Sequence, residues 1–157
     1  MYHVNMLWAS SLPHPSALMV RETAKVLYGA PSSPYSITAT DLREAAETGF
    51  DREVLRHVVD QVCYPHEALE FMYRIVPRAT FNRRTVLSPE ESERTERLAR
   101  VFALAEYTFE SADRARDFLN RPHHSLGNKK PRDLALTEMG ARQVETHLWQ
   151  GLYGVFS

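Results

Sequence analysis

The strongest structural signal in this sequence is the start of a long helix at Ser88. Serine is a favoured N-cap residue, Pro89 suits the first helical position, and Glu91 stands where its carboxylate can bond back to the cap. Three Glu–Arg pairs at four-residue spacing follow, each able to stabilise a helix by about 0.2–0.5 kcal/mol: Glu90–Arg94, Glu93–Arg97 and Glu96–Arg100. An apolar stripe then runs from Leu98 to Phe109. We therefore expect the second half of this helix to be buried and its charged first half to be solvated.

Other segments also have helical spacing, and no segment alternates in polarity over enough residues to predict a strand. The expected helices cover residues 17–28, 41–48, a segment capped by Asp51, a segment opened by Pro65, 78–84, 111–119, a short turn at 131–136 and a last helix capped by Thr137. The fourth should bury Leu69, Met72 and Tyr73. The last should bury Met139, Ala141, Val144, Leu148 and Leu152. The pattern predicts an all-α protein.

Composition places the chain among ordinary globular proteins. It has 157 residues, of which 43% are hydrophobic and 25% charged, and its net charge is -1. Its single cysteine, Cys63, has no partner within the chain, which is typical of a reducing compartment. No apolar run is long enough to span a membrane, so we expect a cytoplasmic protein without a membrane partner. The small net charge means that any DNA binding must come from a local basic patch or from dimerisation.

One such patch lies between Arg74 and Arg84, where four arginines occur without an acidic residue. Two short helices joined by a tight turn, the second of them basic, form the outline of a helix-turn-helix. The candidate DNA-binding residues are Arg78, Thr80, Asn82, Arg83 and Arg84. The usual glycine is absent from the turn, and a solvated helix end is the alternative interpretation.

No arrangement of residues indicates catalysis or cofactor binding. The adjacent His123 and His124 lack the spacing that directs two imidazoles from one helix to a metal, and no glycine-rich phosphate loop occurs. Cys63 follows a valine-rich helix face, where a buried and inert thiol is expected. We expect no catalytic residue, no metal, no cofactor and no enzyme activity.

The C-terminal end is unusually apolar. Hydrophobic and aromatic residues crowd into the last ten positions: Leu148, Trp149, Leu152, Tyr153, Val155 and Phe156. Such a tail either folds back on the core or supplies an aromatic anchor to a partner.

The sequence from about residue 80 to residue 156 resembles the Xre/MbcA/ParS-type antitoxins, which are partners of RES-domain toxins in bacterial type II toxin-antitoxin systems. The resemblance rests on ordered motifs across half of the chain. They are residues 80–84 (TFNRR), 87–94 (LSPEESER), 97–101 (RLARV), Ala115, Phe118, Leu119, 121–123 (RPH), 126–127 (LG), 130–134 (KPRDL), Thr137, 140–141 (GA), 144–145 (VE) and 153–155 (YGV).

This resemblance implies a helical antitoxin with two parts. We expect an N-terminal extension and Xre-like helix-turn-helix DNA-binding domain in residues 1–86 and a toxin-binding domain in residues 87–157. RES toxins resemble ADP-ribosyltransferases and act on NAD, and the family's antitoxins cover the toxin's NAD site. The residues expected to bind the toxin are Leu148, Trp149, Leu152, Tyr153, Gly154, Val155, Phe156, Ser157, Lys130 and Arg132.

The resemblance also implies the other partners. We expect autorepression of the operon through operator DNA, by a homodimer within a larger toxin-antitoxin complex. The alternative is a stand-alone helix-turn-helix transcription regulator whose C-terminal half only dimerises.

Overall fold

The computed structural model describes residues 15–29 and 37–153, and in these ranges every regular element is a helix. The helices are α1 Pro15–Tyr28, α2 Ala39–Thr48, α3 Arg52–Val62, α4 Pro65–Ile75, α5 Arg78–Arg83, α6 Pro89–Phe109, α7 Ala112–Leu119, α8 Pro131–Leu134 and α9 Glu138–Leu152, with a 3-10 turn at His124–Leu126. Outside the helices, these ranges contain two isolated antiparallel bridges, Asp51 with Val86 and His123 with Lys129. The all-α fold class is confirmed. None of the helices in the described ranges is long and apolar enough to cross a bilayer.

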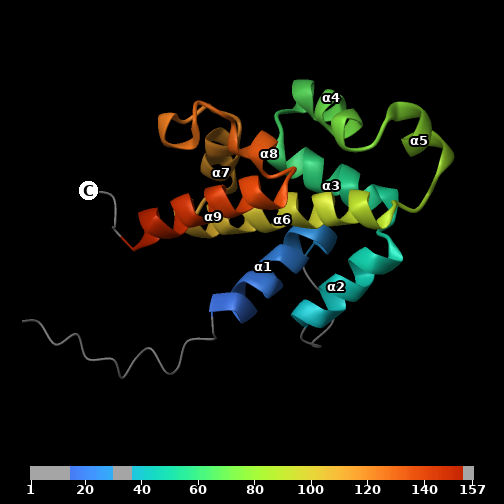
Figure 1. The fold of residues 1–157 in the computed structure, drawn as a ribbon, viewed down its shortest axis with the longest axis horizontal. Coiled ribbons are helices and arrows are strands. Elements are labelled where there is room, and N and C mark those ends of the chain that lie inside the picture. Colours follow the sequence, from blue (N-terminus) through green and yellow to red (C-terminus); the bar gives the residue numbers. More distant parts are fainter. Residues whose placement is uncertain (1–14, 30–36, 154–157) are drawn as a thin grey trace, which may run out of the picture.

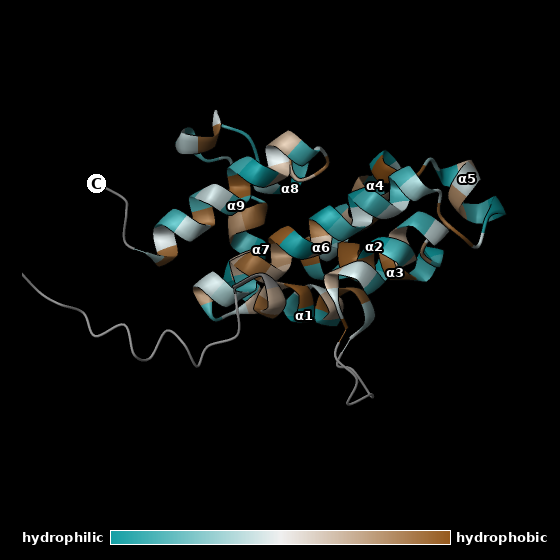
Figure 2. Ribbon diagram, turned by 60° about the horizontal axis from the view of Figure 1, so that its bottom comes forward, coloured by the Kyte–Doolittle hydropathy of each residue, from teal (hydrophilic) through white to brown (hydrophobic). Residues whose placement is uncertain are grey.

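Helix α6 forms the centre of the fold, and α1, α2, α3, α7 and α9 pack around it (Figure 1). Leu98, Phe102 and Leu104 lie in its middle and are almost fully buried. Figure 2 shows hydrophobic segments gathered where α1, α3 and α6 meet. Because α6 contacts helices from both halves of the chain, the two halves share one core; the division at residue 86 stays a prediction.

The helix starts follow the local capping signals. Ser88 accepts a hydrogen bond from the Glu91 amide while the Glu91 carboxylate accepts one from the Ser88 amide, which completes the predicted capping box. Asp51 and Thr137 cap α3 and α9 as expected. Helix α2 begins earlier than predicted, because Thr38 forms a second capping box with Asp41.

The expectation of a solvated first half of α6 holds for Glu90 and Glu93, which are exposed, and is wrong for the opposite side of the helix. Ser92 and Thr95 are fully buried, and Ser92 Oγ accepts a hydrogen bond of 2.9 Å from the amide of Phe50. The start of α6 therefore packs beneath the loop between α2 and α3. Of the three predicted Glu–Arg pairs, Glu96–Arg100 is the one that the described structure contains.

Two residues assigned to apolar helix faces lie on the surface instead. Met139 is 77% exposed and Leu69 is 58% exposed. Met139 lies in the first turn of α9, and Leu69 lies on the side of α4 opposite the buried Phe71 and Ile75.

Candidate functional surfaces

Helices α4 and α5 form the predicted pair of short helices, with Val76 and Pro77 between them. Phe81 is 2% exposed and anchors α5 to the core, and its ring meets Tyr73 of α4 edge to face. Arg78, Asn82 and Arg83 are exposed, whereas Thr80 is half-buried. This arrangement presents one polar and basic face of α5 to solvent.

The remaining arginines of the predicted basic patch are held by carboxylates. Arg84 Nη2 donates two hydrogen bonds, of 2.8 and 3.1 Å, to the carboxylate of Glu91, which also caps α6. Arg74 Nη1 lies 2.8 Å from Asp133 in α8. Within the described part of the chain, Arg78 and Arg83 form no ion pair, so they are the arginines of this patch that are most open to a polyanion.

Two further arginines lie beside α5, and the sequence analysis missed them. Arg52 and Arg56 of α3 each place the guanidinium 5.4 Å from the centre of the Phe81 ring. They precede Phe81 by more than 20 residues, so no local pattern could have identified them.

The second candidate surface lies at the C-terminal end of α9. Trp149 and Leu152 are partly buried, and Tyr153 is 69% exposed. The rings of Trp149 and Tyr153 stack with centroids 5.8 Å apart and an angle of 17° between their planes. Leu148, expected to bind the toxin, is 2% exposed and belongs to the core. The predicted toxin-binding residues Gly154, Val155, Phe156 and Ser157 lie outside the described residues.

One side of α9 faces solvent along the whole length of the helix. This side extends the candidate surface at the C-terminal end of α9. Its exposed residues are Glu138, Met139, Arg142, Gln143, Thr146 and Gln150. Of these, the sequence analysis named only Met139, and it expected that residue to be buried. The exposed residues recur at helical spacing opposite the buried Ala141, Val144 and Leu148. The sequence held one signal of this exposed side, because its exposed residues after Arg142 are uncharged. Glu145, the one charged residue in this part of α9, is partly buried.

Arg132, predicted to meet the toxin, lies in the interior. It is 7% exposed, and its Nη1 atom donates hydrogen bonds to Asn120 Oδ1 at 2.7 Å and Glu67 Oε2 at 3.0 Å. The same atom lies 3.6 Å from the sulfur of Cys63. Lys130, by contrast, is partly exposed at the start of α8. Arg132 therefore supports the loop before α9, while Lys130 remains available at its surface.

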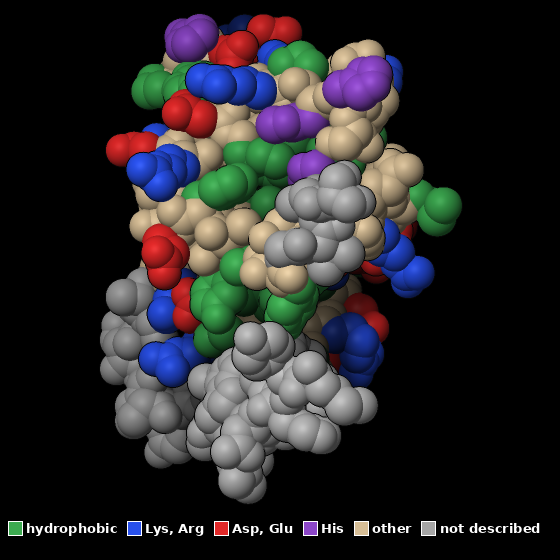
Figure 3. Space-filling model, turned by 90° about the vertical axis from the view of Figure 1, so that its left-hand side faces the viewer, with side chains coloured by type: hydrophobic (Ala, Val, Ile, Leu, Met, Phe, Trp, Pro, Cys, Tyr) green, Lys and Arg blue, Asp and Glu red, His purple; other side chains and the backbone are tan. Residues whose placement is uncertain are grey.

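Aromatic and imidazole rings join that loop to α9. The His123 ring lies 4.5 Å from the Phe118 ring and 6.3 Å from the His147 ring. Burial lowers the pKa of His147, and the nearby His123 lowers it further. Figure 3 shows histidine side chains gathered on this face of the molecule.

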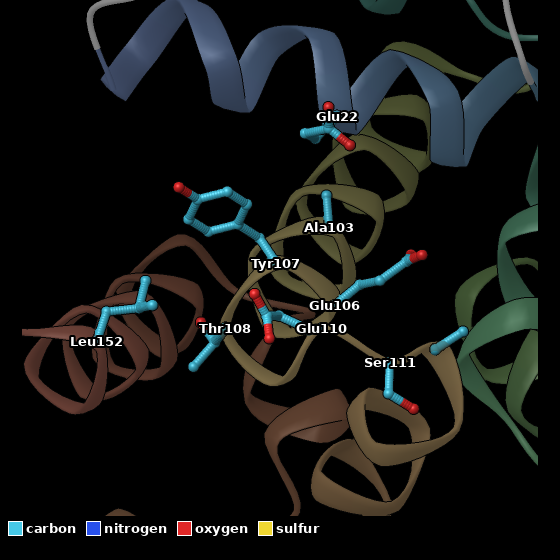
Figure 4. A pocket seen from close by; sticks show the side chains of 9 residues that line it. Glu22, Ala103, Glu106, Tyr107, Thr108, Glu110, Ser111 and Leu152 are labelled. Carbon is cyan, nitrogen blue, oxygen red and sulfur yellow. The ribbon is translucent and has the colours of Figure 1, made fainter. Parts of the chain in front are cut away.

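An open pocket of about 480 Å³ lies beside the end of α9. Figure 4 shows Glu22 from α1, Tyr107 from α6 and Leu152 from α9 around it, and Ala112 at the start of α7 also lines it. Glu106 and Glu110 also line it. A pocket lined by acidic side chains therefore lies next to the end of α9, where Trp149 and Tyr153 are stacked.

Comparison with known families gives two matches, one over each half of the chain. Residues 41–100 match the family described as the antitoxin Xre-like helix-turn-helix domain, and residues 104–154 match the antitoxin Xre/MbcA/ParS C-terminal toxin-binding domain. Helices α4 and α5 fall in the first match, and α7, α8 and α9 fall in the second. A comparison with curated proteins gave no match.

Proposed function

The chain belongs to the Xre/MbcA/ParS-type antitoxins, and on that basis we propose that it neutralises a RES-domain toxin by covering the toxin's NAD site. The contact surface is the C-terminal end of α9 with its exposed side, continued by residues 154–157. Lys130 adds a positive charge at the edge of this surface.

The observation that carries this proposal is the stacked pair Trp149 and Tyr153 inside the toxin-binding region. An exposed tyrosine backed by a tryptophan offers a large contact area with few rotatable bonds. Such aromatic side chains are frequent among the few residues that supply most of the binding energy at an interface. Occlusion of a substrate site requires slow dissociation, which an aromatic anchor supports, and it requires no reaction from the antitoxin itself.

Toxin neutralisation is tested by expressing the neighbouring toxin gene together with variants of this chain. Trp149→Ala combined with Tyr153→Ala should restore toxin-dependent growth arrest and NAD loss. Leu69→Ala is the matched control, because Leu69 is also an exposed apolar residue but lies on α4. Full protection by the double variant would place the toxin contact elsewhere.

DNA binding is the second proposed function, and the exposed face of α5 favours it. Arg78 and Arg83 suit phosphates or guanine edges, and Asn82 suits adenine. We propose that a homodimer presents two α5 helices to operator half-sites about one DNA turn apart and so represses the operon.

The test measures binding to duplex DNA from directly upstream of the chain's own gene. Arg83→Ala removes one contact from each protomer of the proposed dimer. It should weaken binding and lower the slope of log affinity against log salt by about 1.8, the value for two phosphate contacts. Arg43→Ala, which removes an exposed arginine from α2, is the control.

A neighbouring gene whose product is harmless when expressed alone would favour the alternative function. The chain would then be a stand-alone regulator whose C-terminal half only dimerises.

A further inference from the structure

The exposed helix α5 is too short to be stable by itself. It has six residues, and its N-cap, Pro77, provides no side-chain hydrogen bond. Isolated helices shorter than about 12–15 residues are marginal in water, so the orientation of α5 depends on contacts with the rest of the fold. Phe81 supplies one such contact from the buried side.

A second set of contacts comes from Arg52, the first residue of α3. Its Nη1 atom donates hydrogen bonds to the carbonyl oxygens of Phe81, at 2.8 Å, and Asn82, at 3.3 Å. Its backbone amide donates to the carbonyl oxygen of Thr85 at 2.8 Å. The last carbonyls of a helix lack partners within the helix, and a cation placed there is favourable. Arg52 thus closes the C-terminal end of α5.

We propose that Arg52 is a positioning residue for DNA recognition, which holds α5 at the angle at which Asn82 and Arg83 reach the DNA. This inference rests on the proposed DNA-binding function of α5. Arg52 acts through the helix and not by contacting DNA, because its guanidinium is already engaged by two carbonyls and the Phe81 ring. Its side chain is 30% exposed, and Glu53 lies 3.6 Å from its Nε atom.

Arg56 provides a matched comparison within the same helix. Its guanidinium lies at the same 5.4 Å from the Phe81 ring, and it also pairs with Glu53, at 3.5 Å. Its side chain is 52% exposed. Among the described residues, however, Arg56 donates no hydrogen bond to α5. The two arginines therefore differ mainly in their contact with the carbonyls at the end of α5.

The first test uses the full chain and the upstream duplex at several salt concentrations. Arg52→Gln should lower the affinity at least tenfold with an unchanged salt slope, because no phosphate contact is lost. Arg52→Lys should restore part of the affinity, and Arg56→Gln should change it less than threefold. Unchanged affinity in Arg52→Gln would overturn the proposal. A salt slope reduced by about 1.8, the value for one phosphate contact from each protomer, would also overturn it, because Arg52 would then contact DNA.

The second test reads the position of α5 without DNA. Amide hydrogen exchange should become faster in Arg52→Gln across residues 80–85 and remain unchanged across α9, and toxin neutralisation should persist. Unchanged exchange at residues 80–85 would overturn the proposal. Faster exchange throughout the chain would also overturn it, because Arg52 would then support the whole fold. If the wild-type chain fails to bind the duplex, the proposed DNA function fails, while the exchange experiment still decides the role of Arg52.

Discussion

The guanidinium of Arg132 lies 3.0 Å from the carboxylate of Glu67, and this ion pair joins α8 of the toxin-binding region to α4 of the helix-turn-helix region. Arg74 and Asp133 form a second pair between the same helices. Asn120 extends the link, because its side-chain amide accepts from Arg132 and donates to the carbonyl oxygen of Val62 at the end of α3. The two regions are therefore held together by polar contacts as well as by α6.

Arg132→Met should destabilise the protein by about 2–3 kcal/mol, since it leaves Glu67 and the buried Asn120 oxygen without their shared donor. Urea unfolding followed by circular dichroism measures the change. Arg142→Met, at an exposed position of α9, is the control and should change the stability by less than about 0.5 kcal/mol. Equal effects of the two substitutions would contradict a structural role for the network.

Cys63 should be unreactive in the folded protein. Burial raises the pKa of its thiol to about 11, although the nearby Arg132 opposes this shift. Between pH 9 and pH 11 the unfolded chain loses the thiol proton and the folded chain keeps it, so this contribution to stability is full below pH 9 and is lost as the pH rises through 11. Alkylation at pH 8 should be slow without urea and fast in urea. Equal rates would show that the thiol is accessible.

Glu96 should make stability depend on pH in the acidic range. Burial raises its pKa above the ordinary value of 4.5, and Arg100, which opposes this shift, is shared with Glu138 and Glu145. A carboxyl with a raised pKa favours folding below pH 4.5, and this contribution is lost as the pH rises through the folded-state pKa. As the pH rises from 4.5 through the folded-state pKa of Glu96, the wild type should lose this contribution, whereas Glu96→Gln cannot. The stability of Glu96→Gln relative to wild type should therefore increase over this pH range. Parallel stability curves for the two proteins would contradict this.

Gly140 should tolerate no side chain. It lies in α9 where a Cβ atom would overlap the backbone carbonyl of Leu134 at the end of α8. Gly140→Ala should cost about 1–3 kcal/mol of stability despite the better helix propensity of alanine. Gln143→Ala, on the exposed side of α9, should have little effect. Stabilisation by Gly140→Ala would show that α8 and α9 can separate at no cost.

The helices could be predicted from sequence where the signals are local. The caps at Asp51, Ser88 and Thr137 depend on residues within three positions, and all three form as predicted. The burial of Ser92 was missed because its partner is the amide of Phe50, more than 40 residues away in the sequence.

The functional surfaces were harder to predict for the same reason. A basic stretch of sequence does not reveal that Arg84 is tied to Glu91 or that Arg52 reaches the end of α5. Arg132 resembled a surface charge in the sequence, yet its partners Glu67 and Asn120 come from other helices. The apolar end of the sequence left two interpretations open, and Tyr153 is exposed as a contact residue requires, while its contact with a toxin stays a prediction.

In the proposed function, the end of α9 covers the toxin's NAD site. The most direct measurement is NAD consumption by the purified neighbouring toxin, titrated with wild-type chain, with the Trp149→Ala and Tyr153→Ala double variant, and with chain lacking residues 152–157. We expect stoichiometric inhibition by wild type and by the control variant Leu69→Ala, and at least a hundredfold weaker inhibition by the double variant and the shortened chain. Equal inhibition by all four proteins would contradict the proposed function.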